Sequence, residues 1–208
     1  MVPSGLRETP VFRTLQPLVL ASASPRRREM LSALGLDFEV IPSGTAESGG
    51  EGETPEVLVK RWASEKAQAV AKLRPDCWVL GADTIVLLGS TVLGKPADHE
   101  AAAAMLRLLS GRTHDVISGI CLARRDRHFH QAKAVRTQIR FKELAENEIR
   151  AYVATGEPMD KAGAYGIQGL GGFLVQTVQG SYTNVVGLPL CETLQWLAEQ
   201  GAIAPAGA

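Results

Sequence analysis

The hydrophobic pattern of the chain alternates between short apolar runs and stretches with helical spacing. Strands are predicted by apolar runs and by apolar-polar alternation at residues 18–21, 37–43, 77–88, 115–124, 135–141 and 173–178. Helices are predicted by apolar residues three and four apart at residues 25–34, 54–73, 98–109, 149–153 and 190–197. Because a hairpin at residues 89–96 occurs beside helical crossovers, we expect a mixed sheet with parallel and antiparallel neighbours.

The chain shows no internal repeat and no linker long enough to separate domains. We therefore expect one α/β domain over residues 18–201, with a mixed twisted sheet and flanking helices. Residues 1–17 contain proline and charges but no apolar core, which argues against a signal peptide. Residues 1–17 and residues 202–208 are both expected to be loose tails.

Charge and cysteine content disfavour several classes of protein. Twenty-two Lys and Arg residues balance twenty-two Asp and Glu residues, so no global field attracts nucleic acid or an anionic membrane. No apolar stretch approaches the length of a transmembrane helix. Cys77, Cys121 and Cys191 lie far apart in apolar runs without metal-ligand spacing. They are typical of reduced core residues in a cytoplasmic protein.

An unusual helix start follows the strand at residues 18–21. Arg26, Arg27 and Arg28 occupy the first turn, where the positive end of the helix dipole disfavours cations. Together with the Ser22 hydroxyl and the backbone N–H groups, these guanidinium groups would form a phosphate-binding cradle. The alternative is a solvated helix start whose arginines pair with nearby acids. No P-loop motif is present.

Four charged residues are candidates for chemistry. Asp83 interrupts an apolar strand, where a carboxylate stays ionised only near cations or hydrogen-bond donors. It is suited to act as a general base or Mg²⁺ ligand, or it is a structural residue bound by backbone amides. Lys66 on the inward helix face and Lys95 in the hairpin would meet an acid or phosphate, or else extend into solvent. Glu47, in a glycine-rich acidic loop, could supply a second metal-binding carboxylate.

Residues 157–172 contain five glycines, which indicates a backbone folded tightly against another segment or a flat ligand. Gln168 carries a donor and an acceptor and could read the edge of a base. Lys161 is a candidate substrate-binding cation in the same stretch.

Seven segments resemble the Maf family of nucleotide pyrophosphatases, which is distantly similar in fold to the inosine triphosphate pyrophosphatases. The segments are "LASASPRR", "EKA", "GADTIV", "GKP", "LSGRTH", "EPMDKAGAYGIQGLGG" and "GSYTNVVGLP", in order from Leu20 to Pro189. The resemblance implies hydrolysis of a nucleoside triphosphate to the monophosphate and pyrophosphate, in a central cleft between two lobes. It also implies a divalent cation, Mg²⁺ or Mn²⁺, and a homodimer.

The family's functional positions carry over by resemblance to the proton acceptor Asp83, the specificity positions Arg26, Thr84 and Gln168, and the supporting residues Glu47, Lys66 and Lys95. Ser22, Arg27 and Lys161 are also expected to bind substrate. The specificity residues resemble the branch acting on dTTP and UTP. A uracil or thymine edge presents two carbonyls beside one N–H, which a glutamine amide matches.

Three alternatives remain at this stage. The chain could belong to the branch of the family that acts on 7-methyl-GTP, or it could be a nucleotide-binding regulator of cell division, because the family has also been linked to septum inhibition. The combination of Asp83 with Lys66 and Lys95 favours an enzyme, since a pure binder needs no buried base beside two lysines. A nucleic-acid-binding module is disfavoured by the zero net charge.

Overall fold

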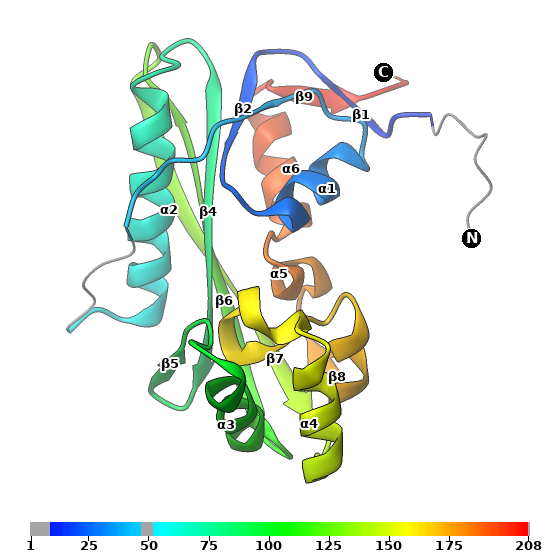
Figure 1. The fold of residues 1–208 in the computed structure, drawn as a ribbon. Coiled ribbons are helices and arrows are strands. Elements are labelled where there is room, and N and C mark those ends of the chain that lie inside the picture. The colour runs from blue at the N-terminus through cyan, green and yellow to red at the C-terminus, as the bar shows by residue number, and fades with distance from the viewer. Residues whose placement is uncertain (1–8, 47–51, 208) are drawn as a thin grey trace.

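A mixed sheet forms the central layer of the protein in the computed structural model, which describes residues 9–46 and 52–207 (Figure 1). Within these residues its strands are β2 (Leu18–Ala21), β3 (Glu39–Val40), β4 (Trp78–Leu88), β5 (Thr91–Leu93), β6 (Thr113–Arg124), β7 (Phe129–Phe141) and β8 (Val175–Gln179). Their order is β3-β2-β4-β6-β7-β8, with β5 paired to β4. β2 is parallel to β3 and β4 and the other pairs are antiparallel, which confirms the predicted mixed sheet.

Helices cover the sheet on both sides (Figure 1). The α-helices are α1 (Pro25–Ser32), α2 (Pro55–Ala71), α3 (His99–Leu109), α4 (Glu146–Ala154), α5 (Tyr182–Val186) and α6 (Leu190–Glu199). The glycine-rich segment contains three 3-10 helices, η1 (Glu157–Asp160), η2 (Ala162–Ala164) and η3 (Leu170–Leu174). Thr54 and Asp98 cap α2 and α3 through side-chain oxygens, as their sequence context predicts. None of the helices in the described ranges has the length and apolar character needed to span a bilayer.

Two apolar cores define an upper and a lower lobe in the orientation of Figure 1. The upper core includes Leu18, Leu20, Leu31, Trp78, Leu80, Leu122, Trp196 and Leu197. The lower core includes Val86, Leu106, Leu109, Val116, Phe141, Ile149, Tyr165 and Leu174. β4 and β6 contribute side chains to both cores, so these two long strands connect the lobes.

Two glycines allow α2 to pack unusually close to the sheet. A Cβ atom at Gly81 would lie 2.3 Å from the carbonyl oxygen of Ala63, and one at Gly119 would lie 2.1 Å from that of Val59. Both distances are far below contact, so a larger residue would push the helix away. Gly119 pairs with Asp83 in the β4–β6 ladder, and the close approach of α2 therefore occurs beside this carboxylate.

The two ends of the chain differ from the expected loose tails. β1 (Phe12–Thr14) pairs in antiparallel register with β9 (Ile203–Pro205) to form a separate two-stranded sheet. Ile203 is buried in the upper core, and Phe12 packs against that core. The physical reason is that these short segments pair with one another across almost the whole length of the chain, which local sequence patterns do not reveal.

Several smaller expectations were also wrong. The helix expected over residues 54–73 ends at Ala71, so Leu73 lies beyond it and is 65% exposed. The strand expected at residues 37–43 is limited to Glu39–Val40, and both residues are exposed. Cys77 and Cys121 are buried as expected, whereas Cys191 is exposed.

Candidate active site

A cleft opens where one edge of β4 is uncovered. β2 ends opposite Gly81 and β5 begins pairing opposite Val86, so the described strands leave residues 82–85 without a neighbour on that side. Successive side chains of a strand point to opposite faces of the sheet. Asp83 and Thr84 therefore flank the same uncovered edge from opposite faces, and one strand supplies both walls of the site.

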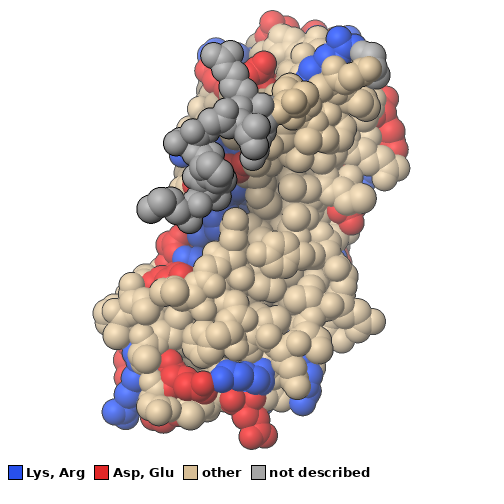
Figure 2. All heavy atoms as spheres, turned by 90° about the vertical axis from the view of Figure 1, so that its right-hand side faces the viewer, with Lys and Arg blue, Asp and Glu red and all other residues tan. Residues whose placement is uncertain are grey.

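The cleft has a volume of ≈ 620 Å³, within the range of small-molecule binding sites. Figure 2 shows the surface hollowed at mid-height between the lobes, with Lys and Arg atoms in the hollow. The predicted site residues in the described part of the chain all line it, and they are Ser22, Arg26, Arg27, Lys66, Asp83, Thr84, Lys95, Lys161 and Gln168. Glu47, also predicted, lies outside the described residues.

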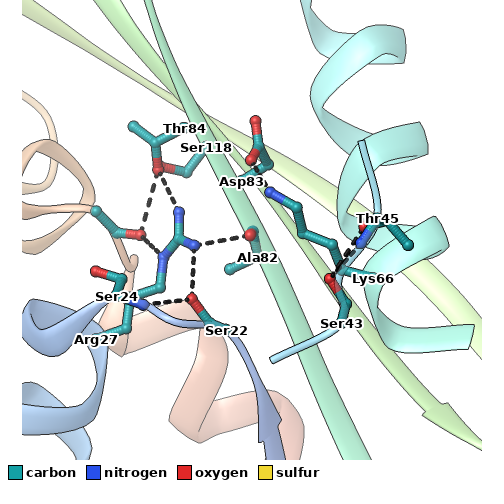
Figure 3. A network of polar contacts seen from close by, with 11 residues as sticks. Ser22, Ser24, Arg27, Ser43, Thr45, Lys66, Ala82, Asp83, Thr84 and Ser118 are labelled. Carbon is teal, nitrogen blue, oxygen red and sulfur yellow. Dashed lines mark hydrogen bonds and ion pairs between the residues drawn. The ribbon is translucent and has the colours of Figure 1, made fainter. Parts of the chain in front are cut away.

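The Asp83 carboxylate forms an ion pair with Lys66 on the α2 side of the sheet (Figure 3). The Lys66 ammonium donates a hydrogen bond to Asp83 Oδ1, and the two side chains are only 12% and 7% exposed. The lysine is thus directed at an acid and does not extend into solvent. A nearby cation stabilises the ionised carboxylate against its desolvation. The pair suits either proton abstraction or cation binding at the cleft.

Arg27 occupies the opposite face of β4, where its guanidinium donates to acceptors that include four in the described residues (Figure 3). Nε donates to the Gly187 carbonyl at 2.8 Å, and Nη1 donates to Ser22 Oγ at 3.1 Å and to the Ala82 carbonyl at 2.8 Å. Nη2 donates to Thr84 Oγ1 at 3.1 Å. The side chain is buried, and it joins the turn after β2, the strand β4 and the segment after α5.

That Arg27 also binds the substrate stays a prediction. Its guanidinium faces carbonyls and hydroxyls of the cleft wall, so its first effect is to hold that wall together. The Thr84 hydroxyl belongs to the same network: it lies 2.8 Å from Ser118 Oγ and donates to the Gly187 carbonyl at 3.2 Å. Arg27 and Thr84 together fix the backbone around the uncovered strand edge.

Arg26 crosses the cleft to Asp160, an acid in η1 that was not among the predicted site residues. Its Nη1 donates to Asp160 Oδ2 at 2.9 Å, and Lys161 Nζ donates to Asp160 Oδ1 at 2.6 Å. Burial raises the pKa of Asp160, but hydrogen bonds from Lys161 and Arg26 outweigh it and hold the pKa below its ordinary value. Asp160 thus connects cations from the two lobes. Its position beside Lys161 in a glycine-rich segment was the available signal.

Lys95 and Gln168 are exposed side chains that line the cleft from the lower lobe. Neither makes a side-chain hydrogen bond or ion pair with another residue in the part of the chain that the structure describes. Their ammonium and amide groups are therefore available to a ligand. The cleft has a charged region around Lys66, Lys95 and Arg26, and a hydrogen-bonding amide beside it.

A second residue that the sequence reasoning missed is His114, behind the lower wall of the cleft. It is buried, its Nε2 lies 2.8 Å from the Tyr165 hydroxyl, and its ring stacks edge-on against Phe141. Its Nδ1 has no hydrogen-bond partner among the described residues. Burial lowers the pKa of His114 to about 4, so the ring is neutral near pH 7. It supports Tyr165, which lines the cleft.

Comparison with known proteins agrees with the motifs. The family model described as Maf-like protein matches residues 17–200. The "dTTP/UTP pyrophosphatase" of Myxococcus xanthus (strain DK1622) is 53% identical over 90% of this chain and 94% of its own, and that of Syntrophus aciditrophicus (strain SB) is 47% identical over 92% and 94%. The solved Ham1 protein of Staphylococcus aureus aligns with a TM-score of 0.42 and 16% identity, over 61% of this chain and 72% of that one. With a family model covering most of its length and relatives near half identity, this chain belongs to the family of Maf-like proteins.

Proposed function

We propose that this protein hydrolyses dTTP and UTP to the nucleoside monophosphate and pyrophosphate, as the names of its relatives indicate for them. The observation that carries the proposal is the buried Asp83–Lys66 pair at the uncovered edge of β4, facing a cleft of ≈ 620 Å³. Such an enzyme would remove nucleotides from the cellular pool. A pure nucleotide-binding regulator has no need of a desolvated carboxylate held by a lysine.

The charges of the cleft suit a triphosphate. Among the described lining residues, five cationic side chains face two carboxylates, and they are Arg26, Arg27, Lys66, Lys95 and Lys161 against Asp83 and Asp160. The excess of positive charge attracts an anionic ligand into a partly enclosed site, where electrostatic attraction is less screened than in water. Lys95 is the most accessible of these cations and is assigned to the phosphates of the leaving pyrophosphate.

In this mechanism Asp83 accepts a proton from the attacking water while the water oxygen bonds to the α-phosphorus. The bond from the α-phosphorus to the bridging oxygen breaks, and pyrophosphate leaves with the electron pair. Lys66 keeps the Asp83 carboxylate ionised, while Lys95 and Arg26 stabilise the negative charge that grows on the phosphates. Preorganised charges of this kind commonly supply the largest part of transition-state stabilisation.

The acidic residues fit a divalent cation of the Mg²⁺ type. Mg²⁺ is usually held by one or two carboxylates together with substrate phosphates, and Asp83 provides one such carboxylate in the cleft. No group of three potential ligands occurs within residues 9–46 and 52–207, so an all-protein cage is not expected there. Glu47 is proposed as the second carboxylate. A bound Mg²⁺ or Mn²⁺ would neutralise phosphate charge and polarise the α-phosphoryl group.

The nucleobase of the substrate is assigned to the lower lobe, where Gln168 and Tyr165 line the cleft. The Gln168 amide can donate to one carbonyl of uracil or thymine and accept from the adjacent ring N–H. Where uracil presents the C4 carbonyl and the N3–H, cytosine presents a donor and an acceptor in the opposite order, so the amide would have to turn over by 180° to match cytosine. The proposed preference for UTP over CTP thus depends on Gln168.

The test is a panel of purified nucleoside triphosphates with Mg²⁺ or Mn²⁺, in which pyrophosphate and orthophosphate are measured separately. We expect pyrophosphate from dTTP and UTP, and a loss of at least a few hundred-fold in Asp83→Asn with an unchanged circular dichroism spectrum. Orthophosphate as the only product, or faster turnover of 7-methyl-GTP, would contradict the proposal. Nucleotide binding without any product would favour the regulator. A homodimer and a cytoplasmic location remain predictions, the first open to sedimentation and the second to cell fractionation.

A further inference from the structure

We propose that Glu157 is a positioning residue that fixes the loop of residues 166–171 and, through it, the base-reading amide of Gln168. The inference rests on the proposed function. It concerns a carboxylate that does not line the cleft and has no part in the chemistry above. Its effect should therefore fall on the choice between bases and leave the bond-breaking step nearly unchanged.

One end of this loop is bound directly by the Glu157 carboxylate. Oε1 accepts hydrogen bonds from the backbone N–H of Gly171 and from the hydroxyl of Tyr152, both at 2.9 Å. Oε2 accepts from the backbone N–H of Leu170 at 2.9 Å. Three donors thus converge on one side chain, which is more than a neutral amide can satisfy.

The other end is bound through the same pair of residues. The Tyr152 hydroxyl, while donating to Glu157, accepts a hydrogen bond from the backbone N–H of Gly166 at 3.1 Å. Both ends of the loop are therefore held by the Glu157–Tyr152 pair. Gln168 lies midway between them and is exposed toward the cleft. No other described residue hydrogen-bonds its amide, so the loop backbone alone sets the position from which the Gln168 side chain reaches the base.

Two glycines of this loop pack closely against the Glu157–Tyr152 pair. A Cβ atom at Gly171 would lie 2.4 Å from the Tyr152 hydroxyl oxygen, and one at Gly169 would lie 2.9 Å from Glu157 Oε2. Gly169 also has φ = +154°, a conformation that favours glycine. The close approach of backbone to the Glu157–Tyr152 pair thus explains Gly169 and Gly171, whereas a Cβ atom at Gly163 would meet Val86 and one at Gly166 would meet Lys161. This contact was not among the residues expected from the sequence.

The carboxylate stays ionised in the pH range of the assay. Burial raises the pKa of Glu157, but the hydrogen bonds donated by Gly171, Leu170 and Tyr152 outweigh that effect and lower the pKa below its ordinary value. Glu157→Gln keeps the size of the side chain but turns an N–H₂ group toward one of these donors. One end of the loop then loses its acceptor while Gln168 remains chemically intact.

The test compares kcat and KM for UTP and CTP in wild type, Glu157→Gln, Gln168→Ala and the double variant. We expect Glu157→Gln to reduce the preference for UTP over CTP by about tenfold, the scale of one charged hydrogen bond. The change should lie mainly in KM for UTP, with kcat within about threefold of wild type. In the double variant the preference should equal that of Gln168→Ala alone, because both changes remove the same recognition.

Glu148→Gln is the matched control, because Glu148 also accepts a backbone N–H, that of Ala145 at 2.9 Å, in the same lobe but away from the cleft. It should leave the preference unchanged. If Glu157→Gln does not fold, Tyr152→Phe removes only the hydroxyl that holds Gly166, and a smaller loss of preference is expected.

Three results would overturn the inference. The preference for UTP over CTP could be unchanged in both Glu157→Gln and Tyr152→Phe, or the losses of preference in Glu157→Gln and Gln168→Ala could multiply in the double variant. The third is a loss of preference in Glu148→Gln as large as that in Glu157→Gln. A wild-type protein that releases no pyrophosphate from any triphosphate would instead defeat the proposed function, and this inference with it.

Discussion

Protonation of the buried His114 should destabilise the protein as the pH falls. The imidazole is 2% exposed, one nitrogen meets the Tyr165 hydroxyl at 2.8 Å, and the other has no partner among the described residues. The protonated ring carries an N–H on both nitrogens, and the one on that second nitrogen would be buried without an acceptor among the described residues. Burial accordingly lowers the pKa of His114 to about 4. In the unfolded chain the same ring has a pKa of about 6.5.

The magnitude follows from this difference. Between the two pKa values the unfolded chain binds a proton that the folded protein does not, so stability falls as the pH decreases. The loss begins near the unfolded pKa and is complete below the folded one. For values of about 6.5 and about 4, it amounts to about 2 kcal/mol at pH 5 and about 3 kcal/mol at pH 4.

The assay is urea denaturation of wild type and His114→Gln at pH 7 and pH 5. A glutamine amide can replace the ring nitrogen that contacts Tyr165, but it does not titrate in this range. The free energy of unfolding of the wild type should fall by about 2 kcal/mol more than that of the variant between the two pH values. Carboxylates with lowered pKa values, such as Glu146, act equally in both proteins and cancel.

His99→Gln serves as the control, because His99 is exposed at the start of α3 in the same lobe. It should retain the full contribution of His114. Equal pH dependence in wild type and His114→Gln would refute the reasoning, since it would mean that the ring is protonated without cost. The same result would require an acceptor near its unpaired nitrogen.

Three further outcomes are expected. Arg27→Lys should lower stability by about 3 kcal/mol in urea denaturation and reduce kcat/KM at least tenfold, because an ammonium leaves buried acceptors of the cleft wall unsatisfied; wild-type stability would contradict the assigned role. Gly119→Ala should lower the free energy of unfolding by about 1–3 kcal/mol, because its Cβ would lie 2.1 Å from the Val59 carbonyl oxygen, whereas Gly94→Ala, where a Cβ meets nothing within 4 Å, should change it little. Chelation with EDTA should abolish pyrophosphate release, and Mg²⁺ or Mn²⁺ should restore it; activity that survives chelation would exclude the proposed cation.

The sequence was most informative where a charge broke an apolar pattern. Asp83 interrupts a strand that is otherwise apolar, and Lys66 interrupts the inward face of a helix, so each demanded a partner. The structure pairs them. The need for a partner could be predicted because burying a lone charge in either place costs free energy.

The division of roles between neighbouring arginines could not be predicted. Arg26 and Arg27 occupy adjacent positions of one helical turn, and local pattern treats them alike. Their difference arises from distant groups: the carbonyl of Gly187 accepts from Arg27, and Asp160 accepts from Arg26. The pairing of β1 with β9 was missed for the same reason, because its partners lie at opposite ends of the chain. Long-range contacts of this kind depend on the assembled fold.

The β4–β6 ladder has a mechanical consequence for the cleft. It runs through nine successive residue pairs, from Val79 with Ala123 to Leu87 with Asp115, and passes from one lobe to the other without interruption. A rotation of one lobe relative to the other would have to bend this pair of strands. Proteins whose halves are joined by flexible crossovers differ in this respect. The two strands therefore set the distance between the walls of the cleft. Nucleotide entry and departure should depend on small rearrangements along the rim.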